Sequence, residues 1–405
     1  MAAPRTNAPA AAARVPLSAV LPPLVLGTAT FNYQYVSDPD RMPSIDIVSR
    51  ALDLGVRAFD TSPYYGPSEA ILGSALRALS PPRESYFLVT KAGRIAPAEF
   101  DYSPAWMRAS VRRSLERLNT SHLDLVYTHD AEFVSPDDVV AAVRELRRLR
   151  DEEALVRYVG ICGYPVPVLC ELAEKVLRET GEPIDAVQSF SHFCIQNNTL
   201  GSDAVLSRLR AAGVSVVTNA SMLSMGLLTT RGVDDGPMAS WHPAPSPLRK
   251  SCKGLVGIAE GVGEKMEEVA LYWAMANWAR VGAVFGSEVL SPAYDGPAKV
   301  GVSVMGVTSV SELEETVAAW QSMLRELAAE SSTDKTPTDT SLLSRHNKIE
   351  RLVKEHMWPA LGEWRNYSWA SPDENFVNQR TQTSDAAAVV DAATSTLAAT
   401  AESHM

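Results

Sequence analysis

Four residues that together can move a proton occur around the ends of three successive apolar segments. Asp60, Lys91 and His129 each end such a segment, and Tyr65 follows Asp60 by five residues. A tyrosine hydroxyl titrates at about 10, so it acts as an acid or base at neutral pH only if a neighbour lowers its pKa. A lysine ammonium does this by favouring the phenolate, an aspartate holds the lysine charged, and a histidine can polarise the substrate oxygen. Each residue alone has a plain explanation as a cap or a packed side chain, but the four together predict a catalytic site.

This set contains an acid and a base but no electron acceptor. An acid/base group at one carbonyl or alcohol carbon, without a nucleophile or a metal, fits hydride transfer to or from a nicotinamide cofactor. The sequence therefore predicts an oxidoreductase with no metal. Its cysteines lack the spacing of a metal site or of a disulfide framework; they are Cys162, Cys170, Cys194 and Cys252.

The elements that position these residues are short β-rich segments that alternate with segments of helical period. Ser103-Pro104 and Ser135-Pro136 carry the signature of helix starts. Near-continuous hydrophobicity in the strands is typical of a parallel sheet buried on both faces. Eight such units predict a closed (β/α)₈ TIM barrel, in which all strand ends meet at one rim. The segments are 24–29, 56–60, 86–91, 123–129, 156–161, 184–189, 214–219 and 301–306.

The late part of the barrel departs from this spacing. Between the last two strands we expect a helix over 264–280, a loop rich in proline and glycine before it (226–263) and an insertion after it (281–300). Long loops in a compact domain are often lids over a site. The sequence leaves open whether the insertion is a lid or inert.

The domain organisation follows from shifts in composition. The barrel is expected over 16–330, a linker over 331–340, and a helix with an aromatic-rich segment that packs on the barrel over 341–370. Few large apolar residues occur at core spacing in 1–15 and 371–405, which predicts disordered tails.

Charge and hydropathy exclude several classes of partner. The 405 residues carry 37 basic and 48 acidic side chains, a formal charge of −11. Nucleic acid or an anionic membrane would need a clustered positive surface. No segment approaches a membrane span or a secretory signal, so we expect a cytoplasmic protein.

The nucleotide site must differ from the usual dinucleotide fold, because no G-x-G-x-x-G follows a strand. In a barrel the phosphates lie near the late βα loops and a helix N-terminus. The segment 306–315 provides such a place, since Ser309 and Glu312 form a capping box at the start of a helix.

Several motifs together resemble the aldo-keto reductases over about residues 20–325. They are DTSPYYGPSE, VTKAGR, SVRRSLERLNTSHLDLVYTHD and NASMLSMGLL. The resemblance implies that Asp60, Tyr65, Lys91 and His129 are the catalytic tetrad, with Tyr65 as proton donor or acceptor. The variant HDAEFV, with GICGYP, is most similar to the members that oxidise the anomeric carbon of a D-arabinose- or L-galactose-type aldose to a lactone.

The same resemblance implies positions that hold the cofactor and the substrate. Gln188 bonds the nicotinamide carboxamide in such proteins, whereas Cys162 and Gly163 replace a common Ser-Asn pair, and Ala220 replaces the aromatic residue that stacks on the ring. Phe31 and His129 are expected to bind the sugar. Trp241 and the Trp-rich segment 358–369 are expected to line its pocket, although aromatic residues in a rim loop often only pack. The cofactor set comprises Gly27, Thr28, Asp60, Cys162, Gly163, Gln188, Ser221, Leu223, Gly226, Gly306, Thr308, Glu312 and Glu315.

Glu312 bears on the choice of nucleotide. Members that prefer NADP place a basic residue near this position, and a glutamate there would repel the 2′-phosphate and could accept from ribose hydroxyls. We therefore expect NAD, with NADP still possible.

Two other functions remain open at this stage. The same tetrad serves aldehyde or ketone reduction with NADPH, and a nicotinamide-binding regulatory subunit can retain all four residues. The family resemblance implies a monomer or a small homo-oligomer and a small-molecule substrate.

Overall fold

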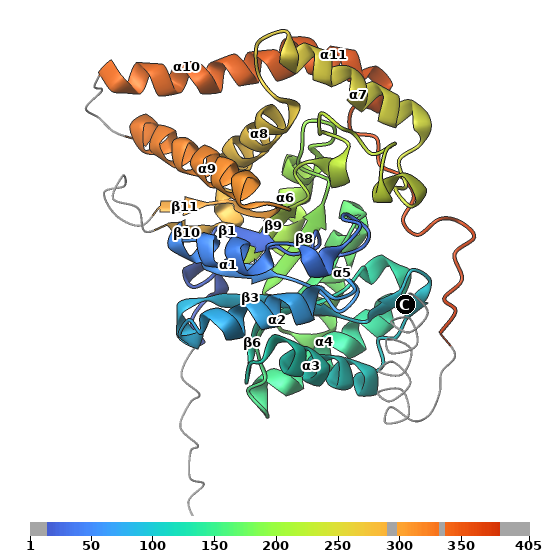
Figure 1. The fold of residues 1–405 in the computed structure, drawn as a ribbon. Helices are drawn as coiled ribbons and strands as arrows, with labels where there is room; N and C mark the ends of the chain where they lie inside the picture. Colours follow the sequence, from blue (N-terminus) through green and yellow to red (C-terminus); the bar gives the residue numbers. More distant parts are fainter. Residues whose placement is uncertain (1–13, 290–297, 332–336, 381–405) are drawn as a thin grey trace, which may run out of the picture.

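The predicted barrel is confirmed by a computed structural model, which describes residues 14–289, 298–331 and 337–380 (Figure 1). Eight parallel strands close in the order β1-β12-β9-β8-β7-β6-β3-β2. Each predicted β-rich segment contains or overlaps one of them, and the bounds differ by a few residues. The strands are β1 (Leu24–Gly27), β2 (Ala58–Asp60), β3 (Phe87–Ala92), β6 (Leu123–Thr128), β7 (Val156–Gly163), β8 (Ala186–Phe190), β9 (Val216–Ala220) and β12 (Val302–Gly306).

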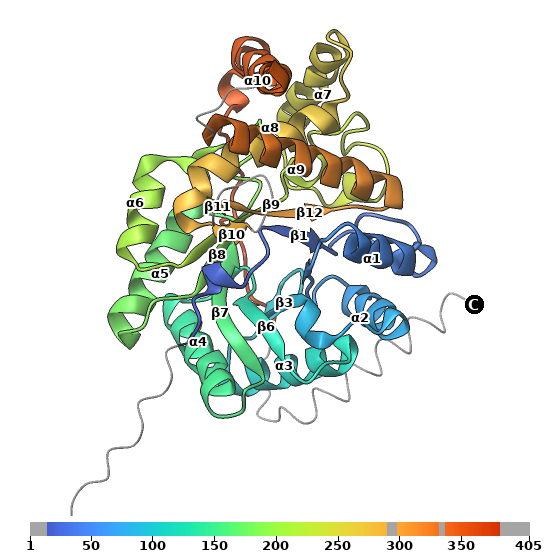
Figure 2. The same cartoon turned by 90° about the vertical axis from the view of Figure 1, so that its left-hand side faces the viewer.

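Helices surround this barrel, as Figure 2 shows in a view along it. Ser103 and Ser135 cap α3 and α4 as predicted, since their side chains accept from Trp106 N and Asp138 N. No helix within the described ranges is long and apolar enough to cross a membrane. The surrounding helices are α1 (Ser44–Asp53), α2 (Ser68–Leu79), α3 (Pro104–Leu118), α4 (Pro136–Asp151), α5 (Val166–Thr180), α6 (Asp203–Ala211), α8 (Met266–Val281) and α9 (Val310–Ser331).

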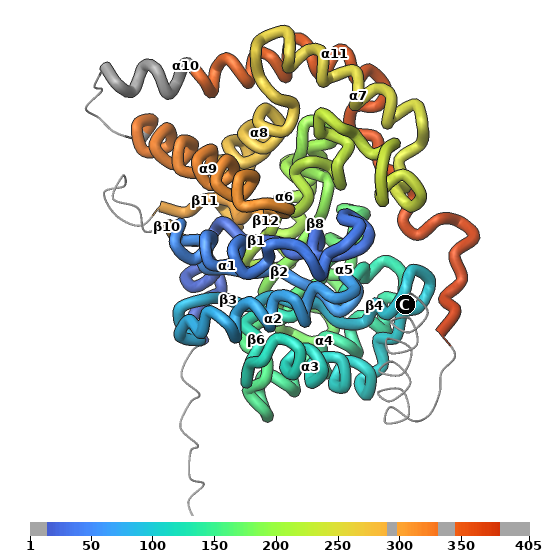
Figure 3. The backbone as a smooth tube through the Cα atoms, viewed as in Figure 1, coloured from blue at the N-terminus to red at the C-terminus, as the bar shows by residue number. Residues whose placement is uncertain are grey.

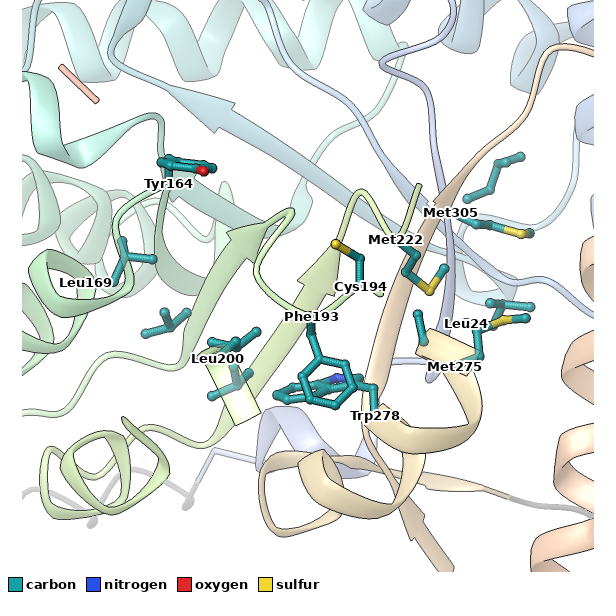
Figure 4. Packing of buried hydrophobic residues seen from close by; sticks show 14 of the residues in the cluster. Leu24, Tyr164, Leu169, Phe193, Cys194, Leu200, Met222, Met275, Trp278 and Met305 are labelled. Carbon is teal, nitrogen blue, oxygen red and sulfur yellow. The ribbon is translucent and has the colours of Figure 1, made fainter. Parts of the chain in front are cut away.

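Alternation along the strands separates two cores. Outward residues such as Leu26 and Phe59 pack against the helices, and Figure 4 shows part of this layer around Phe193 and Trp278. Every second residue instead faces the barrel axis, as Val89 and Leu125 do. Because side chains alternate with period two, the same alternation decides which residues reach the mouth of the barrel.

The described parts of the insertion, 281–289 and 298–300, lie at the end of the barrel opposite the strand C-termini. Strands β10 (Ser287–Val289) and β11 (Ala298–Val300) pair antiparallel, and β10 packs on the 3₁₀ turn Leu17–Ala19. Leu17 and Leu21 close the interior core from this side. The described part of the insertion is therefore no lid over the strand C-termini.

A second helical layer covers α8 and α9. It contains α7 (Ser246–Glu260), so the segment 226–263 is not the continuous loop that its Pro and Gly content predicted. The helices α10 (Pro337–Leu352) and α11 (Trp358–Leu361) complete this layer. α9 extends to residue 331 and α10 begins at 337, so the expected linker is shorter than 331–340, and residues 332–336 lie outside the described ranges.

The ends of the described chain are more ordered than predicted. Near the N-terminus, Arg14 pairs with Asp185, and most of the predicted tail 1–15 lies outside the described residues. Residues 371–380 contact the barrel through backbone hydrogen bonds such as Gln379 N to Ala98 O at 2.8 Å. Only the remainder of the predicted tail, 381–405, lies outside the description. Figure 3 shows the C-terminal segment, in red, running from the helical layer toward β4 (Arg94–Ala96).

Candidate active site

Strand alternation brings the predicted catalytic residues together at the mouth of the barrel. Lys91 follows the inward residues Phe87 and Val89 on β3, and Asp60 follows Ala58 on β2. By the same rule His129 follows Tyr127 just beyond β6. Each side chain continues an inward face, so the three strand ends point their polar groups at one space.

Lys91 and Asp60 form a buried ion pair. Lys91 Nζ donates to Asp60 Oδ1 at 2.5 Å and to Thr61 O at 3.0 Å. Burial acts to lower the pKa of Lys91, but Asp60 and Tyr65 outweigh it and leave the pKa raised. Burial also raises the pKa of Asp60, and Lys91 opposes that change. Lys91 is therefore charged over the whole working pH range.

Tyr65 lies over this ion pair, with its ring centroid 4.8 Å from Lys91 Nζ. A turn holds it, in which Tyr65 N donates to Ser62 O and Gly66 adopts a left-handed φ of 56°. Burial raises the pKa of Tyr65, and Lys91 lowers it by less than burial adds. Lys91 therefore favours the phenolate as expected, but loss of hydration outweighs the ammonium, so the pKa of Tyr65 is not lowered in the free protein.

His129 completes the group as a neutral imidazole. Its ring meets the Tyr65 ring edge to face at 5.7 Å, and His129 Nδ1 is hydrogen bonded to Ser62 Oγ at 2.9 Å. Burial lowers the pKa of His129 to about 3. With Nδ1 engaged by Ser62, Nε2 is the nitrogen left to bind a substrate oxygen.

The four residues border a cavity of about 1940 Å³ that continues to the first turns of α9. Ligand pockets usually measure about 300–1,000 Å³, so this one has room for a dinucleotide together with a substrate. Most of the predicted cofactor residues line it. They are Gly27, Asp60, Cys162, Gln188, Ser221, Leu223, Gly226, Gly306, Thr308, Glu312 and Glu315.

Three predicted residues do not line this cavity. Phe31 is fully buried in the hydrophobic core, so the prediction that it binds substrate is not supported by its position. The Thr28 hydroxyl is used inside the protein, where it lies 2.7 Å from Ser68 Oγ. Gly163 faces Glu132 Oε2, which leaves no space for a Cβ. An aromatic residue after a strand and a glycine at a strand end carry no sequence signal that separates packing from binding.

The α9 end of the cavity is acidic, as the sequence indicates. Ser309 Oγ accepts from Glu312 N at 3.2 Å, and the Glu312 carboxylate accepts from Thr308 N at 2.6 Å and Thr308 Oγ1 at 2.9 Å. The capping box therefore forms with its return bond one residue earlier than usual. Glu315 lies one turn further along the same cavity. A nicotinamide dinucleotide fits this space, with Gln188 and Cys162 near the tetrad and the segment 221–226 and the α9 N-terminus at the other end.

The sequence reasoning missed a charged group beside His129. Arg94 forms an ion pair with Asp130, and both line the cavity. The guanidinium of Arg94 lies over the Tyr64 ring, 3.8 Å from its centroid. Asp130 belongs to the motif HDAEFV and follows a strand, and this position could have identified it as a candidate site residue. Arg94 lies on a short hairpin with no such mark.

The C-terminal segment 366–380, which we name the strap, forms one wall of the cavity. Trp369 stacks on Tyr164 with ring centroids 4.5 Å apart, and Ser368 Oγ lies 3.1 Å from His192 Nε2. Further along, Ser371 Oγ donates to Glu132 Oε1 at 2.9 Å. Trp241 and Trp369 line the cavity, in agreement with the expectation that Trp241 and the aromatic segment lie beside the substrate. Trp358 instead packs on Trp273.

Comparison with known proteins places this barrel and its rim in one family. A model of the Aldo/keto reductase family matches residues 23–331, and the chain belongs to that family. It is therefore an NAD(P)-dependent oxidoreductase. The strap lies outside the matched region.

Two relatives are similar over most of the chain. D-arabinose 1-dehydrogenase of Saccharomyces cerevisiae is 38% identical over 296 residues, which cover 72% of this chain and 81% of the relative. L-galactose dehydrogenase of Arabidopsis thaliana is 33% identical over 320 residues, covering 78% and 87%. Among solved structures, a glycerol dehydrogenase of Gluconobacter oxydans shares the fold, with a TM-score of 0.54 and 19% identity over 89% of this chain and 95% of that chain.

Proposed function

We propose that this protein oxidises the anomeric carbon of an aldose to a lactone, with NAD as the hydride acceptor. The observation that carries the proposal is the placement of Tyr65, His129 and the Lys91 and Asp60 ion pair on one wall of a cavity that reaches α9. The two sugar dehydrogenases among the relatives support the choice of an aldose.

The residues of the rim divide the work of removing a proton. Tyr65 accepts the proton of the C1 hydroxyl as the C1–H bond breaks and the C1=O bond forms. His129, neutral and held by Ser62, donates a hydrogen bond to that oxygen and fixes its direction. The step requires Tyr65 as the phenolate, so the phenol proton that the free protein carries must first be released to solvent. The Lys91 ammonium stabilises the phenolate, and Asp60 keeps Lys91 in place. Bound NAD supplies the hydride acceptor.

The preference for NAD follows from the charge at the far end of the cavity. Glu312 and Glu315 place carboxylates along the first turns of α9, where a 2′-phosphate would meet repulsion. Basic side chains also line the cavity: Lys265 lies 3.3 Å from Glu268 and 4.0 Å from Glu315, Arg345 pairs with Glu264, and Arg325 lies further along α9. Glu312 has no such cation partner among the ion pairs of the described residues. We expect a lower KM for NAD than for NADP.

A second function is favoured by one observation. The raised pKa of Tyr65 keeps its proton in the free protein, and a protonated tyrosine suits donation to a carbonyl oxygen. Reduction of aldehydes or ketones with NADPH is therefore the alternative. A purely regulatory, nicotinamide-binding role would require the intact tetrad to be inactive.

The test is a substrate panel with the purified full chain. Reduction of NAD and NADP is followed with D-arabinose, L-galactose, L-fucose and D-xylose, and oxidation of NADPH with simple aldehydes. Aldose-dependent reduction of NAD with formation of a lactone supports the proposal. Activity with aldehydes and NADPH alone would assign the protein to the reductases, and inactivity in every assay would favour the regulatory role.

A further inference from the structure

An ion pair next to the catalytic histidine has no part in the proton transfer described above. Asp130 follows His129 directly and is only 4% exposed. Its Oδ2 lies 3.8 Å from His129 Nε2 and accepts a hydrogen bond from Arg94. Both members of the pair line the cavity, so they form a charged edge beside the place where C1 would react.

Stability does not account for this pair. Removing two charges from water costs several kcal/mol, and a buried ion pair often recovers no more than that cost. Arg94 Nε is buried without a hydrogen-bond partner among the described residues. Asp130 itself has a left-handed φ of 53°, a conformation found mainly at glycine, asparagine and aspartate. A buried donor without a partner beside a cavity calls for an explanation, and a ligand site provides one.

The pair is held rigidly. The Arg94 guanidinium lies 3.8 Å from the Tyr64 ring centroid, and the Phe100 and Phe133 ring centroids lie 5.3 and 5.5 Å away. Burial acts to raise the pKa of Asp130, but His129 and Arg94 outweigh it and leave the pKa lowered. The site therefore presents a fixed carboxylate acceptor and fixed guanidinium donors, which suits a hydroxyl because a hydroxyl both donates and accepts.

The neighbouring acid cannot serve the same purpose. Glu132 Oε1 already accepts from Tyr164 N at 3.0 Å and from Ser371 Oγ at 2.9 Å, and its Oε2 is buried against Gly163. Glu132 fastens the strap to the barrel. Asp130 is the acid that faces His129.

We propose that Asp130, supported by Arg94, binds the C2 hydroxyl of the aldose and so selects substrates that carry a hydroxyl next to the reacting carbon. The separation of 3.8 Å between His129 Nε2 and Asp130 Oδ2 allows the two groups to bind two vicinal oxygens at once. With the C1 oxygen at His129 and Tyr65, the C2 oxygen is the next group that reaches Asp130. The inference rests on the proposed aldose oxidation and names the specificity residue within it.

The experiment removes the hydroxyl from the substrate and its partner from the protein. D-arabinose and 2-deoxy-D-ribose differ only at C2, and L-galactose with 2-deoxy-L-galactose gives a second pair. kcat/KM with NAD is measured for the wild type, Asp130→Asn and Arg94→Met. We expect the wild type to prefer the 2-hydroxy sugar by about 10- to 100-fold, the value of a hydrogen bond to a charged group. Asp130→Asn should lower kcat/KM for the 2-hydroxy sugar by far more than for the 2-deoxy sugar, so that most of the preference is lost.

The controls separate the possible failures. Asp185→Asn, at the opposite end of the barrel, removes another arginine-paired aspartate and should leave the C2 preference intact. Equal losses on both sugars in Asp130→Asn and Arg94→Met would overturn the inference, since the pair would then only position His129. A wild type that oxidises aldoses without a C2 preference would also overturn it. A wild type that oxidises no aldose but reduces simple aldehydes would reject the proposed function itself, and the inference with it.

Discussion

Both ends of the barrel contain buried carboxylates with basic partners, but the carboxylate oxygens are hydrogen bonded differently at the two ends. At the N-terminal end Asp124 Oδ2 accepts from Leu88 N at 2.8 Å and Arg83 at 2.6 Å, and Asp124 Oδ1 accepts from Arg157 at 3.0 Å. Asp185 likewise uses both oxygens, with Arg14 and Val159 N. No oxygen of these two acids is left over.

At the C-terminal end Asp60 keeps an oxygen unused. Asp60 bonds Lys91 through Oδ1, whereas its Oδ2 has no hydrogen bond of normal geometry among the described residues, although the Gln188 amide is close enough to lower the pKa of Asp60. Buried polar groups are normally satisfied, so an unpaired carboxylate oxygen among the catalytic residues is consistent with a role in the reaction. Asp124 and Asp185 are fully hydrogen bonded and hold the fold, whereas Asp60 retains an open oxygen at the active site.

The largest effect is expected at the tyrosine of the rim. Tyr65→Phe removes the group that accepts the proton and should lower kcat about 10²- to 10⁴-fold, with little change in thermal stability. Steady-state NAD reduction measures it. Tyr64→Phe is the matched control, because its ring still supports Arg94 and it loses only a hydroxyl 3.5 Å from Gln34 Nε2. A similar fall in both variants would remove the distinction between these adjacent residues.

Lys91→Met tests whether the ion pair of Lys91 and Asp60 contributes both to stability and to catalysis. The variant leaves the Asp60 carboxylate buried without its cation, which should cost about 3–5 kcal/mol in the free energy of unfolding and abolish activity. Adding Asp60→Asn should recover most of the stability and none of the activity. Denaturant unfolding and NAD reduction are measured side by side, and an active double variant would contradict the account.

Asp124→Asn tests the opposite end. It weakens bonds to Leu88 N, Arg83 and Arg157, so we expect a loss of about 2 kcal/mol in unfolding free energy. kcat/KM of the folded protein should not change, because these bonds lie at the far end of the barrel. A fall in kcat/KM without a loss of unfolding free energy would contradict the separation of stabilising and catalytic charges between the two ends.

The last prediction concerns Glu132, which takes no part in the reaction, and its effect on stability depends on pH. Burial, and next the charge of Asp130, raise the pKa of Glu132 to about 8. Between about pH 4.5 and pH 8 the folded state therefore keeps a proton that the unfolded state has released. As a result, the free energy of unfolding falls as the pH rises toward 8. Glu132→Gln has no proton to lose. Its stability relative to the wild type should rise by about 3–4 kcal/mol between about pH 5 and pH 8, measured by thermal unfolding. A constant difference would mean that Glu132 is ionised in the fold.

Local patterns were sufficient to predict the barrel and its reactive rim. Eight apolar segments and helix starts such as Ser135-Pro136 are local signals, and period-two alternation carries Lys91 and Asp60 to the mouth. The helix α7 was missed because Pro245, Pro247 and the nearby glycines resemble a loop, yet a proline such as Pro247 suits the first turn of a helix.

The rest depends on contacts between residues far apart in the chain. Arg94 meets Asp130 across 36 positions, and Ser371 meets Glu132 across 239, so no local pattern announces either pair. Burial likewise decides the pKa of Tyr65, and the sequence gives no measure of how much water the rim excludes.

The most direct test of the central claim follows the hydrogen on the anomeric carbon. D-arabinose and L-galactose carrying deuterium at C1 are incubated with the full-length protein and NAD, and the products are examined by mass spectrometry. We expect the label to appear in the reduced nucleotide and to be missing from a lactone product, and we expect Tyr65→Phe nearly to abolish this transfer. Reduced nucleotide without label, or label retained in the oxidised sugar, would contradict it.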